Sequence, residues 1–543
     1  MKRRNFITKT TIASTALGAL LASCGNNNST APAAPVNNTA KTVTIDEFEL
    51  NELSISQLQE KYTAGTYNAE AVTNLYLKRI DALDKNGPKV QSVIEINPDA
   101  ISIAKAMDAE RKAGKIRGPL HGVPVLIKDN IDTADKMQTT AGSLAMEGNI
   151  ATRDAFLVKK LRDAGAVILG KTNLSEWANF RSTQSCSGWS SRGGQTKNPY
   201  ITDHNPCGSS SGSGVATSSN LCMIAIGTET DGSVTCPAAV SGIVGLKPTV
   251  GLVSRSGIIP ISHTQDTAGP MARTVTDVAI LLTVMAGADA EDAVTNNSNT
   301  KSILEYSSFL NPNSLKGKRI GVEKKPQGKN HFMHALQKKN LDILKQQGAT
   351  IIEIEYLDNI SKQAAAEFEV LEFEFKAGLN KYLSTANATV KTLADVIAFN
   401  KQNEDKAMPY FKQETLESSD AKQGLESAAY KAALKTSHEG SKKIIDQVIQ
   451  QNKLDAICGL TMGPACSIDN IYGDRWGEVF LTQPAATSGY PHITVPGGMI
   501  YDLPVGFSFF GAAFSEGALL GFAYAFEQAT KNRKPPTFKK AFL

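Results

Sequence analysis

Stretches with the period of an amphipathic helix alternate with short apolar runs over the first 330 residues. After Asn68, a good helix N-cap, apolar side chains recur at the helical period, which predicts a helix over 68–85. Two more helices are predicted over 99–113 and 154–164, each followed by a glycine. The apolar runs that predict strands lie at 123–127, 166–169, 223–226 and 319–322. This alternation indicates an α/β fold, in which helices cover both faces of a sheet.

The pattern changes between about residues 330 and 453, where long polar stretches rich in Lys, Gln, Glu and Ala are typical of helices. Strand-like apolar runs return at 456–458, 492–495 and 505–510, and no repeat of fixed period is visible. With 41% hydrophobic and 20% charged residues, the chain can bury a large core. We therefore expect one domain over 46–543, with a helical insertion at about 330–453.

Residues 1–23 have the features of an export signal, with four basic and no acidic side chains followed by a short apolar stretch. The Arg3-Arg4 pair resembles a twin-arginine signal. The motif LASC resembles a bacterial lipobox, in which Cys24 would be the lipidated first residue of the mature protein. Residues 24–45 are too polar to pack and predict a tether. We expect an exported periplasmic or cell-surface lipoprotein, anchored to a bacterial membrane through Cys24 alone.

The basic residues of this export signal account for the whole formal net charge of +4. The remaining chain is neutral, which gives no electrostatic reason to expect a nucleic-acid partner. An exported protein can form disulfides, although a chain of this size does not need them. On sequence separation alone, Cys458 and Cys466 are the most plausible pair. There is no CxxC spacing of the kind that binds zinc.

Three short segments contain residues suited to nucleophilic catalysis without histidine. CGSSSGSG, at 207–214, combines hydroxyl groups with glycines, whose backbone freedom lets donors crowd around one point. GTETDGSVTCP, at 227–237, places Ser233 on a constrained turn. LIKDN, at 126–130, places Lys128 behind an apolar run, where burial would lower the pKa of its amine. Two serines and a basic lysine are sufficient for acyl transfer.

These segments resemble the motifs of the amidase signature family, and Ser209 and Ser233 have the spacing of the family's two serines. Similar blocks follow in the same order at 118–133, 164–178 and 242–275, so the likeness runs from about residue 50 to the C-terminus. The resemblance implies the family's fold, which is a mixed sheet flanked by helices.

The resemblance also implies roles for individual residues. Ser233 matches the nucleophile, Ser209 the bridging serine that relays a proton, and Lys128 the base. The backbone amides that match the oxyanion hole belong to Thr230, Asp231, Gly232 and Ser233. Asp231 replaces a glycine of the commoner pattern, so its side chain would crowd or tune that hole. Glu229 is expected to order the nucleophile turn, and no metal or organic cofactor is expected.

Two departures, GSSSGSG for GGSSGGS and TETDGS for TDTGGS, resemble the peptide amidase branch, which acts on C-terminal amides of peptides. We therefore expect a serine amidohydrolase for small-molecule or peptide amides, with C-terminal peptide amides as the first candidate. An amidase for aryl, aliphatic or fatty amides is the alternative. The export signal disfavours the branch that amidates misacylated tRNA. A non-catalytic lipoprotein that binds amides or peptides is the alternative of another class, and the intact Lys128, Ser209 and Ser233 argue against it.

A competing interpretation takes Gly208 to Gly212 as a G-x-S-x-G elbow, with Ser210 as the nucleophile of an α/β-hydrolase. That elbow needs a strand immediately before it, whereas 198–206 has the composition of a loop. Such an enzyme also needs a histidine base downstream, and His438 and His492 are the only candidates late in the chain. Ser210, Ser211 and Ser213 are therefore expected to be structural.

Three further features have alternative explanations. His331 and His334 have an H-x-x-H spacing, but without acidic or cysteine partners a solvated helix face is favoured over a metal site. Cys207 and Cys236 flank the two serines, and buried packing is favoured over a thiol nucleophile. Trp189 is a candidate either for the acyl pocket or for the core or a lid.

Overall fold

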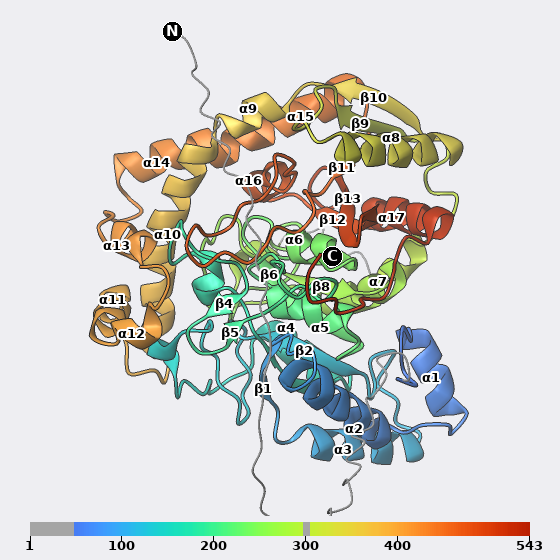
Figure 1. The fold of residues 1–543 in the computed structure, drawn as a ribbon, viewed down its shortest axis with the longest axis vertical. Coiled ribbons are helices and arrows are strands. Elements are labelled where there is room, and N and C mark those ends of the chain that lie inside the picture. The colour runs from blue at the N-terminus through green and yellow to red at the C-terminus, as the bar shows by residue number, and fades with distance from the viewer. Residues whose placement is uncertain (1–47, 297–304, 543) are drawn as a thin grey trace, which may run out of the picture. The chain divides into compact units, whose positions relative to one another are not determined.

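An 11-stranded mixed sheet runs through the computed structural model, which describes residues 48–296 and 305–542 (Figure 1). In order across the sheet, the strands are β1 (Val93–Ile96), β3 (Val167–Thr172), β2 (Pro124–Lys128), β6 (Ile224–Glu229), β8 (Thr267–Ala272), β7 (Val244–Lys247), β12 (His492–Ile500), β13 (Leu503–Phe510), β11 (Ala456–Leu460), β9 (Arg319–Glu323) and β10 (Thr350–Ile354). Strand β2 pairs in parallel with β3 and β6, and β9 pairs in parallel with β10 and β11. The pairs from β6 to β13 across the middle are antiparallel. This mixed sheet confirms the predicted fold class.

Helices pack against the sheet along its length. Those that contact its strands or lie beside it are α1 (Ile55–Thr63), α2 (Ala69–Arg79), α3 (Ala100–Lys112), α4 (Phe156–Asp163), α5 (Ser211–Ser218), α6 (Thr235–Val240), α7 (Val275–Met285), α8 (His331–Gln346), α16 (Gln483–Ser488) and α17 (Glu516–Thr530). Helix α5 contacts β2, β3, β6 and β8, and α6 contacts β7, β12 and β13. These two short helices begin within the two serine-bearing segments, so their packing on the sheet positions both serines.

The predicted helices and strands before residue 330 are confirmed. Asn68 caps α2 by accepting a hydrogen bond from the Ala71 amide at 2.8 Å, and a π-helical turn, Ile80–Lys85, continues the helix. The other two predicted helices are α3 and α4. The predicted apolar runs became β2, β3, β6 and β9. In β2, β3 and β6 every residue is buried, which explains continuous apolar runs without alternation.

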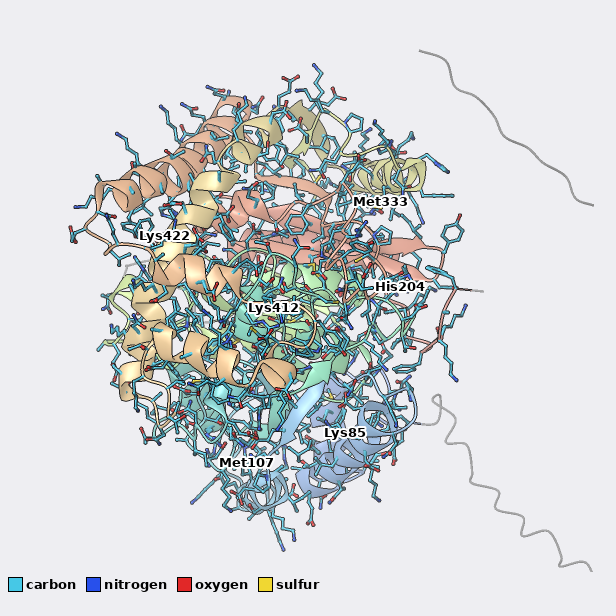
Figure 2. The ribbon with its side chains drawn as sticks, turned by 60° about the vertical axis from the view of Figure 1, so that its left-hand side comes forward. Lys85, Met107, His204, Met333, Lys412 and Lys422 are labelled. Carbon is cyan, nitrogen blue, oxygen red and sulfur yellow. A yellow bond between two sulfur atoms is a disulfide. The ribbon has the colours of Figure 1, made fainter. Side chains whose placement is uncertain are left out.

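The segment predicted to be a helical insertion contains one strand. Strand β10 pairs in register with β9 at the end of the sheet, because its isoleucines extend that edge. The helices that follow are α9 (Leu357–Ser361), α10 (Ala364–Thr385), α11 (Leu393–Gln402), α12 (Glu404–Ala407), α13 (Glu414–Asp420), α14 (Ala428–Leu434) and α15 (Gly440–Asn452). Figure 1 shows α10 to α13 along the left-hand side and α9, α14 and α15 along the top, and Figure 2 labels Lys412 and Lys422 in the connecting loops. Strands β1, β7 and β8 were not predicted, and the sequence of β8, TAGPMA, contains glycine and proline.

The predicted disulfide pairing is wrong. Cys207 and Cys236 form a disulfide, with their Cα atoms 6.0 Å apart, whereas Cys458 and Cys466 are free. Cys458 is buried within β11, and the Cys466 carbonyl accepts a hydrogen bond from the Asn205 amide, so the two thiols occupy different environments. The fold instead brings together the start of the first serine-bearing segment and the end of the second. Cys207 and Cys236 are buried as expected, but as bonded partners rather than packed thiols.

The export signal, Cys24 and the predicted tether lie outside the described residues and stay predictions. In the part of the chain that is described, none of the helices has both the length and the apolar character needed to span a bilayer.

Candidate active site

Lys128 is fully buried at the end of β2 and contacts one of the predicted serines. Its Nζ donates to Ser209 Oγ at 2.7 Å and to Thr228 Oγ1 at 2.8 Å. Burial lowers the pKa of the Lys128 amine from 10.5 to about 7, although the carboxylates of Asp266 and Glu229 act in the opposite direction. A large part of the amine is therefore neutral near pH 7, and it can accept a proton.

Ser209 belongs to a loop that is held between the segment after β3 and the turn of Ser233. The Ser175 amide donates to the Ser209 carbonyl at 3.1 Å, and the Ser210 amide donates to the Ser233 carbonyl at 3.0 Å. A Cβ atom at Gly208 would lie 2.1 Å from Ser175 Oγ, so only glycine fits there. The glycine-rich composition thus serves close packing, and the fold places the segment in the core instead of in a linker.

Ser233 lies on a tight turn between β6 and α6. Gly232 has a φ of 76°, which favours glycine, and Glu229 Oε2 accepts hydrogen bonds from the Val234 and Thr235 amides at 2.8 and 2.9 Å. The expectation that Glu229 orders this turn is confirmed. The Ser233 hydroxyl lines a pocket and has no hydrogen-bond partner in residues 48–296 and 305–542. Lys128 is therefore hydrogen-bonded directly to Ser209, and the segment of Ser209 is hydrogen-bonded to Ser233 through the backbone.

The four amides predicted to form an oxyanion hole are available. Among the described residues, none of the backbone N–H groups from Thr230 to Ser233 is used as a donor. The orientation of the Asp231 side chain is fixed, because Thr482 Oγ1 donates a hydrogen bond to its Oδ1. These unused donors surround the nucleophile, where charge develops on a substrate carbonyl oxygen during acyl transfer.

The pocket beside Ser233 has a volume of about 340 Å³. Its apolar lining includes Phe368 and Leu371 from α10, together with Trp476 and Phe480, which no sequence motif indicated. Trp189 does not line it; this indole packs in the core against Phe411, with ring centroids 5.1 Å apart. A second cavity, of about 580 Å³, shares Ala178, Thr230 and Ile261 with this pocket and reaches Thr228 beside Lys128.

The hydrolase elbow is excluded by the surroundings of Ser210. The segment between β5 (Gly194–Gln195) and Gly208 contains no extended strand among the described residues. Ser210 Oγ donates to the Thr228 carbonyl and accepts from the Thr228 amide, at 3.0 and 3.1 Å. The candidate bases are engaged elsewhere, because His438 contacts the Thr487 carbonyl and His492 the Ser508 hydroxyl. Ser210 is a structural residue.

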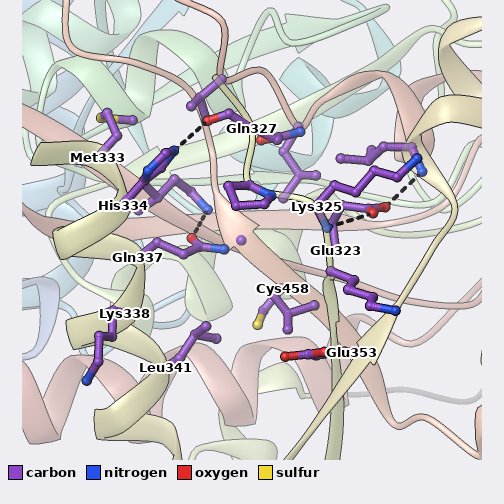
Figure 3. Close-up of a pocket in the computed structure, with 18 of the residues that line it drawn as sticks. Glu323, Lys325, Gln327, Met333, His334, Gln337, Lys338, Leu341, Glu353 and Cys458 are labelled. Carbon is purple, nitrogen blue, oxygen red and sulfur yellow. Dashed lines mark hydrogen bonds between the residues drawn. The ribbon is translucent and has the colours of Figure 1, made fainter. Parts of the chain in front are cut away.

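A third cavity, of about 400 Å³, lies between α8 and strands β9, β10 and β11, apart from the serines (Figure 3). His334 Nε2 contacts the Gln327 and Gly328 carbonyls, at 3.3 and 3.1 Å, on one side of this cavity. His331 is exposed on α8, and its ring packs against Phe332. In the described ranges, no group of three or more His, Cys, Asp or Glu side chains could hold a metal ion.

Comparison with known proteins identifies the family. The family model Amidase matches residues 71–520. The chain is 41% identical over 505 residues to a protein named probable amidase from Arabidopsis thaliana, covering 90% of this chain and 92% of that protein. It is 38% identical over 499 residues to a protein named putative amidase from Arthroderma benhamiae, covering 88% of this chain and 81% of that protein.

Among solved structures, the native peptide amidase from Stenotrophomonas maltophilia matches with a TM-score of 0.86 at 49% identity, covering 90% of this chain and 99% of that chain. The chain belongs to the amidase signature family, which confirms the resemblance. It is an amidase, a hydrolase of carbon–nitrogen bonds in amides.

Proposed function

We propose that the protein hydrolyses carboxamides through Ser233, Ser209 and Lys128. Ser233 Oγ attacks the amide carbonyl while its proton passes to Ser209, whose own proton passes to the neutral Lys128 amine. The amides from Thr230 to Ser233 stabilise the oxyanion. The proton then returns from Lys128 to the leaving nitrogen as the C–N bond breaks, and water hydrolyses the acyl-enzyme. The observation that carries this proposal is the 2.7 Å contact between the buried Lys128 amine and Ser209.

C-terminal amides of peptides are the proposed substrates. The likeness to a peptide amidase over 90% of the chain supports this choice. The pocket also supports it, because it combines apolar side chains such as Phe368 and Trp476 with hydroxyl groups such as Ser185 and Ser187. Aryl, aliphatic or fatty amides are the second candidates, since the apolar lining would accept them too.

We further propose that the enzyme works outside the cytoplasm as a lipoprotein anchored through Cys24. The support is the order of basic start, apolar stretch, LASC motif and polar tether in residues 1–45.

Labelling with a serine-directed fluorophosphonate tests the nucleophile. The wild type and Ser210→Ala should be labelled and active, because the Ser210 hydroxyl is fully buried and hydrogen-bonded only to the backbone of Thr228. Ser233→Ala should be folded, unlabelled and inactive. Labelling of Ser233→Ala with loss in Ser210→Ala would reject the assignment. Absence of both labelling and activity in the wild type would favour a non-catalytic binding protein. Turnover of peptide amides compared with aryl and fatty amides tests the substrate class.

A further inference from the structure

Two carboxyl groups meet beside the proposed oxyanion hole. Asp231 belongs to the turn of Ser233 and is partly exposed toward the pocket. Glu367 comes from the first turn of α10, in the helical segment, and is buried. The two carboxyl groups are neighbours, because Thr482 Oγ1 donates to Asp231 Oδ1 and Nε2 of the next residue, Gln483, donates to Glu367 Oε2 at 2.9 Å. Two neighbouring carboxyl groups in a buried site repel each other when both are ionised, so the pair favours a state in which one of them carries a proton.

The other partners of the pair place this proton on Asp231. Glu367 Oε1 accepts from Gln265 Nε2 at 3.0 Å, and its Oε2 accepts from Gln483 Nε2 at 2.9 Å. These two hydrogen bonds favour the ionised form of Glu367, although burial raises the pKa of its carboxyl. Asp231 accepts one hydrogen bond, from Thr482. Burial and the neighbouring charge of Glu367 raise the pKa of Asp231 well above its usual value.

The remaining charged groups near Asp231 come from two strands. Glu229 of β6 is a further negative neighbour, and it is bound to the amides that follow Ser233. Lys247 of β7 is fully buried and donates to the Tyr490 carbonyl at 2.7 Å. Neither forms an ion pair with the Asp231 carboxyl among the described contacts, so Glu367 and Thr482 set its orientation.

We propose that the proton shared between Asp231 and Glu367 keeps the oxyanion-binding turn uncharged, and that Asp231 and Glu367 are positioning residues for amide hydrolysis. A carboxylate on this turn would repel the negative charge that develops on the substrate oxygen. It would also compete for the free amides of its own turn. Glu367 prevents both effects by holding Asp231 protonated and turned away. The inference rests on the proposed role of Ser233 and explains why an acidic residue is tolerated where the commoner motif has glycine.

Isosteric variants separate this role from packing. Asp231→Asn keeps a neutral side chain that can donate to Glu367 and accept from Thr482, so its kcat on a dipeptide amide should stay at least about fivefold above that of Glu367→Gln. In Glu367→Gln, the new amide donates to Asp231 and stabilises its charged form, so kcat should fall by about 10- to 100-fold with little change in KM. The double variant Asp231→Asn/Glu367→Gln should recover to within about fivefold, because no charge remains on the turn.

The pH dependence gives a second readout that a packing role would not change. The deficit of Glu367→Gln relative to the wild type should shrink as pH falls from 8 to 5.5, because Asp231 regains a proton. The double variant should show a constant ratio to the wild type. Glu374→Gln is the matched control, since Glu374 is a buried carboxyl on the same helix that binds Ser262 and Tyr430 instead.

Three results would overturn the inference. They are additive losses of kcat in the double variant, a ratio of Glu367→Gln activity to wild-type activity that stays constant with pH, and an Asp231→Asn enzyme as impaired as Glu367→Gln. These outcomes are distinct from failure of the proposed function. In that case Ser233→Ala would remain active, whatever the behaviour of Glu367→Gln.

Discussion

Replacing Lys128 with methionine should inactivate the enzyme and stabilise its fold at neutral pH. The folded amine has a pKa of about 7, compared with 10.5 for an unperturbed lysine. Between these values the unfolded chain binds a proton that the folded chain does not, so wild-type stability rises with pH. The penalty of burying this lysine is fully present below pH 7 and disappears as pH approaches 10.5. Methionine has a similar length and carries no such penalty.

The two pKa values give the size of the effect. With about 1.4 kcal/mol for each pKa unit, the penalty is about 4 kcal/mol at pH 7.5 and about 1.5 kcal/mol at pH 9.5. The variant leaves Ser209 Oγ and Thr228 Oγ1 without their donor, which costs about 1–3 kcal/mol at either pH. Lys128→Met should therefore be more stable than the wild type at pH 7.5. Its advantage should fall by about 2.5 kcal/mol by pH 9.5.

Urea unfolding of both proteins, followed by tryptophan fluorescence and circular dichroism, measures this difference. Asp266, with a pKa of about 6, titrates below the chosen range, and Lys247, with a pKa of about 8, is present in both proteins. Lys112→Met, at an exposed position at the end of α3, is the control and should show a difference that does not change with pH.

Wild-type kcat/KM on a peptide amide should rise through the same pKa near 7, because only the neutral amine accepts the proton. A pH-independent difference between Lys128→Met and the wild type would show that Lys128 is not the group with this pKa. The mechanism would then lose its base.

The remaining predictions concern the disulfide and the N-terminus. Cys207→Ser/Cys236→Ser removes a cross-link that closes a loop with a sequence separation of 29, so the free energy of unfolding should fall by about 3–4 kcal/mol. The double variant should also lower kcat more than it changes KM, because the bonded segments hold Ser209 and Ser233. A double variant with the kcat and the unfolding midpoint of the wild type would contradict this. Cys466→Ser, which removes a free thiol, is the control. Cys24→Ala, or globomycin treatment, should prevent lipid attachment and release the enzyme from membranes, as measured by fractionation. Unchanged retention would mean that the LASC motif does not specify lipidation.

Local patterns in the sequence predicted most of the central elements. The runs at 123–127, 166–169 and 223–226 are continuous because both faces of β2, β3 and β6 are covered. Burial of this kind, like the helix cap at Asn68, can be recognised from a few neighbouring residues in the sequence. Strands β8 and β10 could not be recognised from local patterns. Strand β8 has a weak β propensity and β10 lies in a polar stretch, but pairing with neighbouring strands outweighs both effects.

The candidate site divides in the same way. The sequence by itself pointed to Lys128, Ser209 and Ser233, because the segments that contain them resemble the motifs of the amidase signature family. Only the tertiary structure decided that the Lys128 amine contacts Ser209, that Cys207 bonds to Cys236, and that Glu367 lies beside Asp231. Each of these depends on contacts between segments far apart in the chain. Their proximity follows from strand order and helix packing, and single-chain patterns of hydrophobicity and charge do not encode it directly.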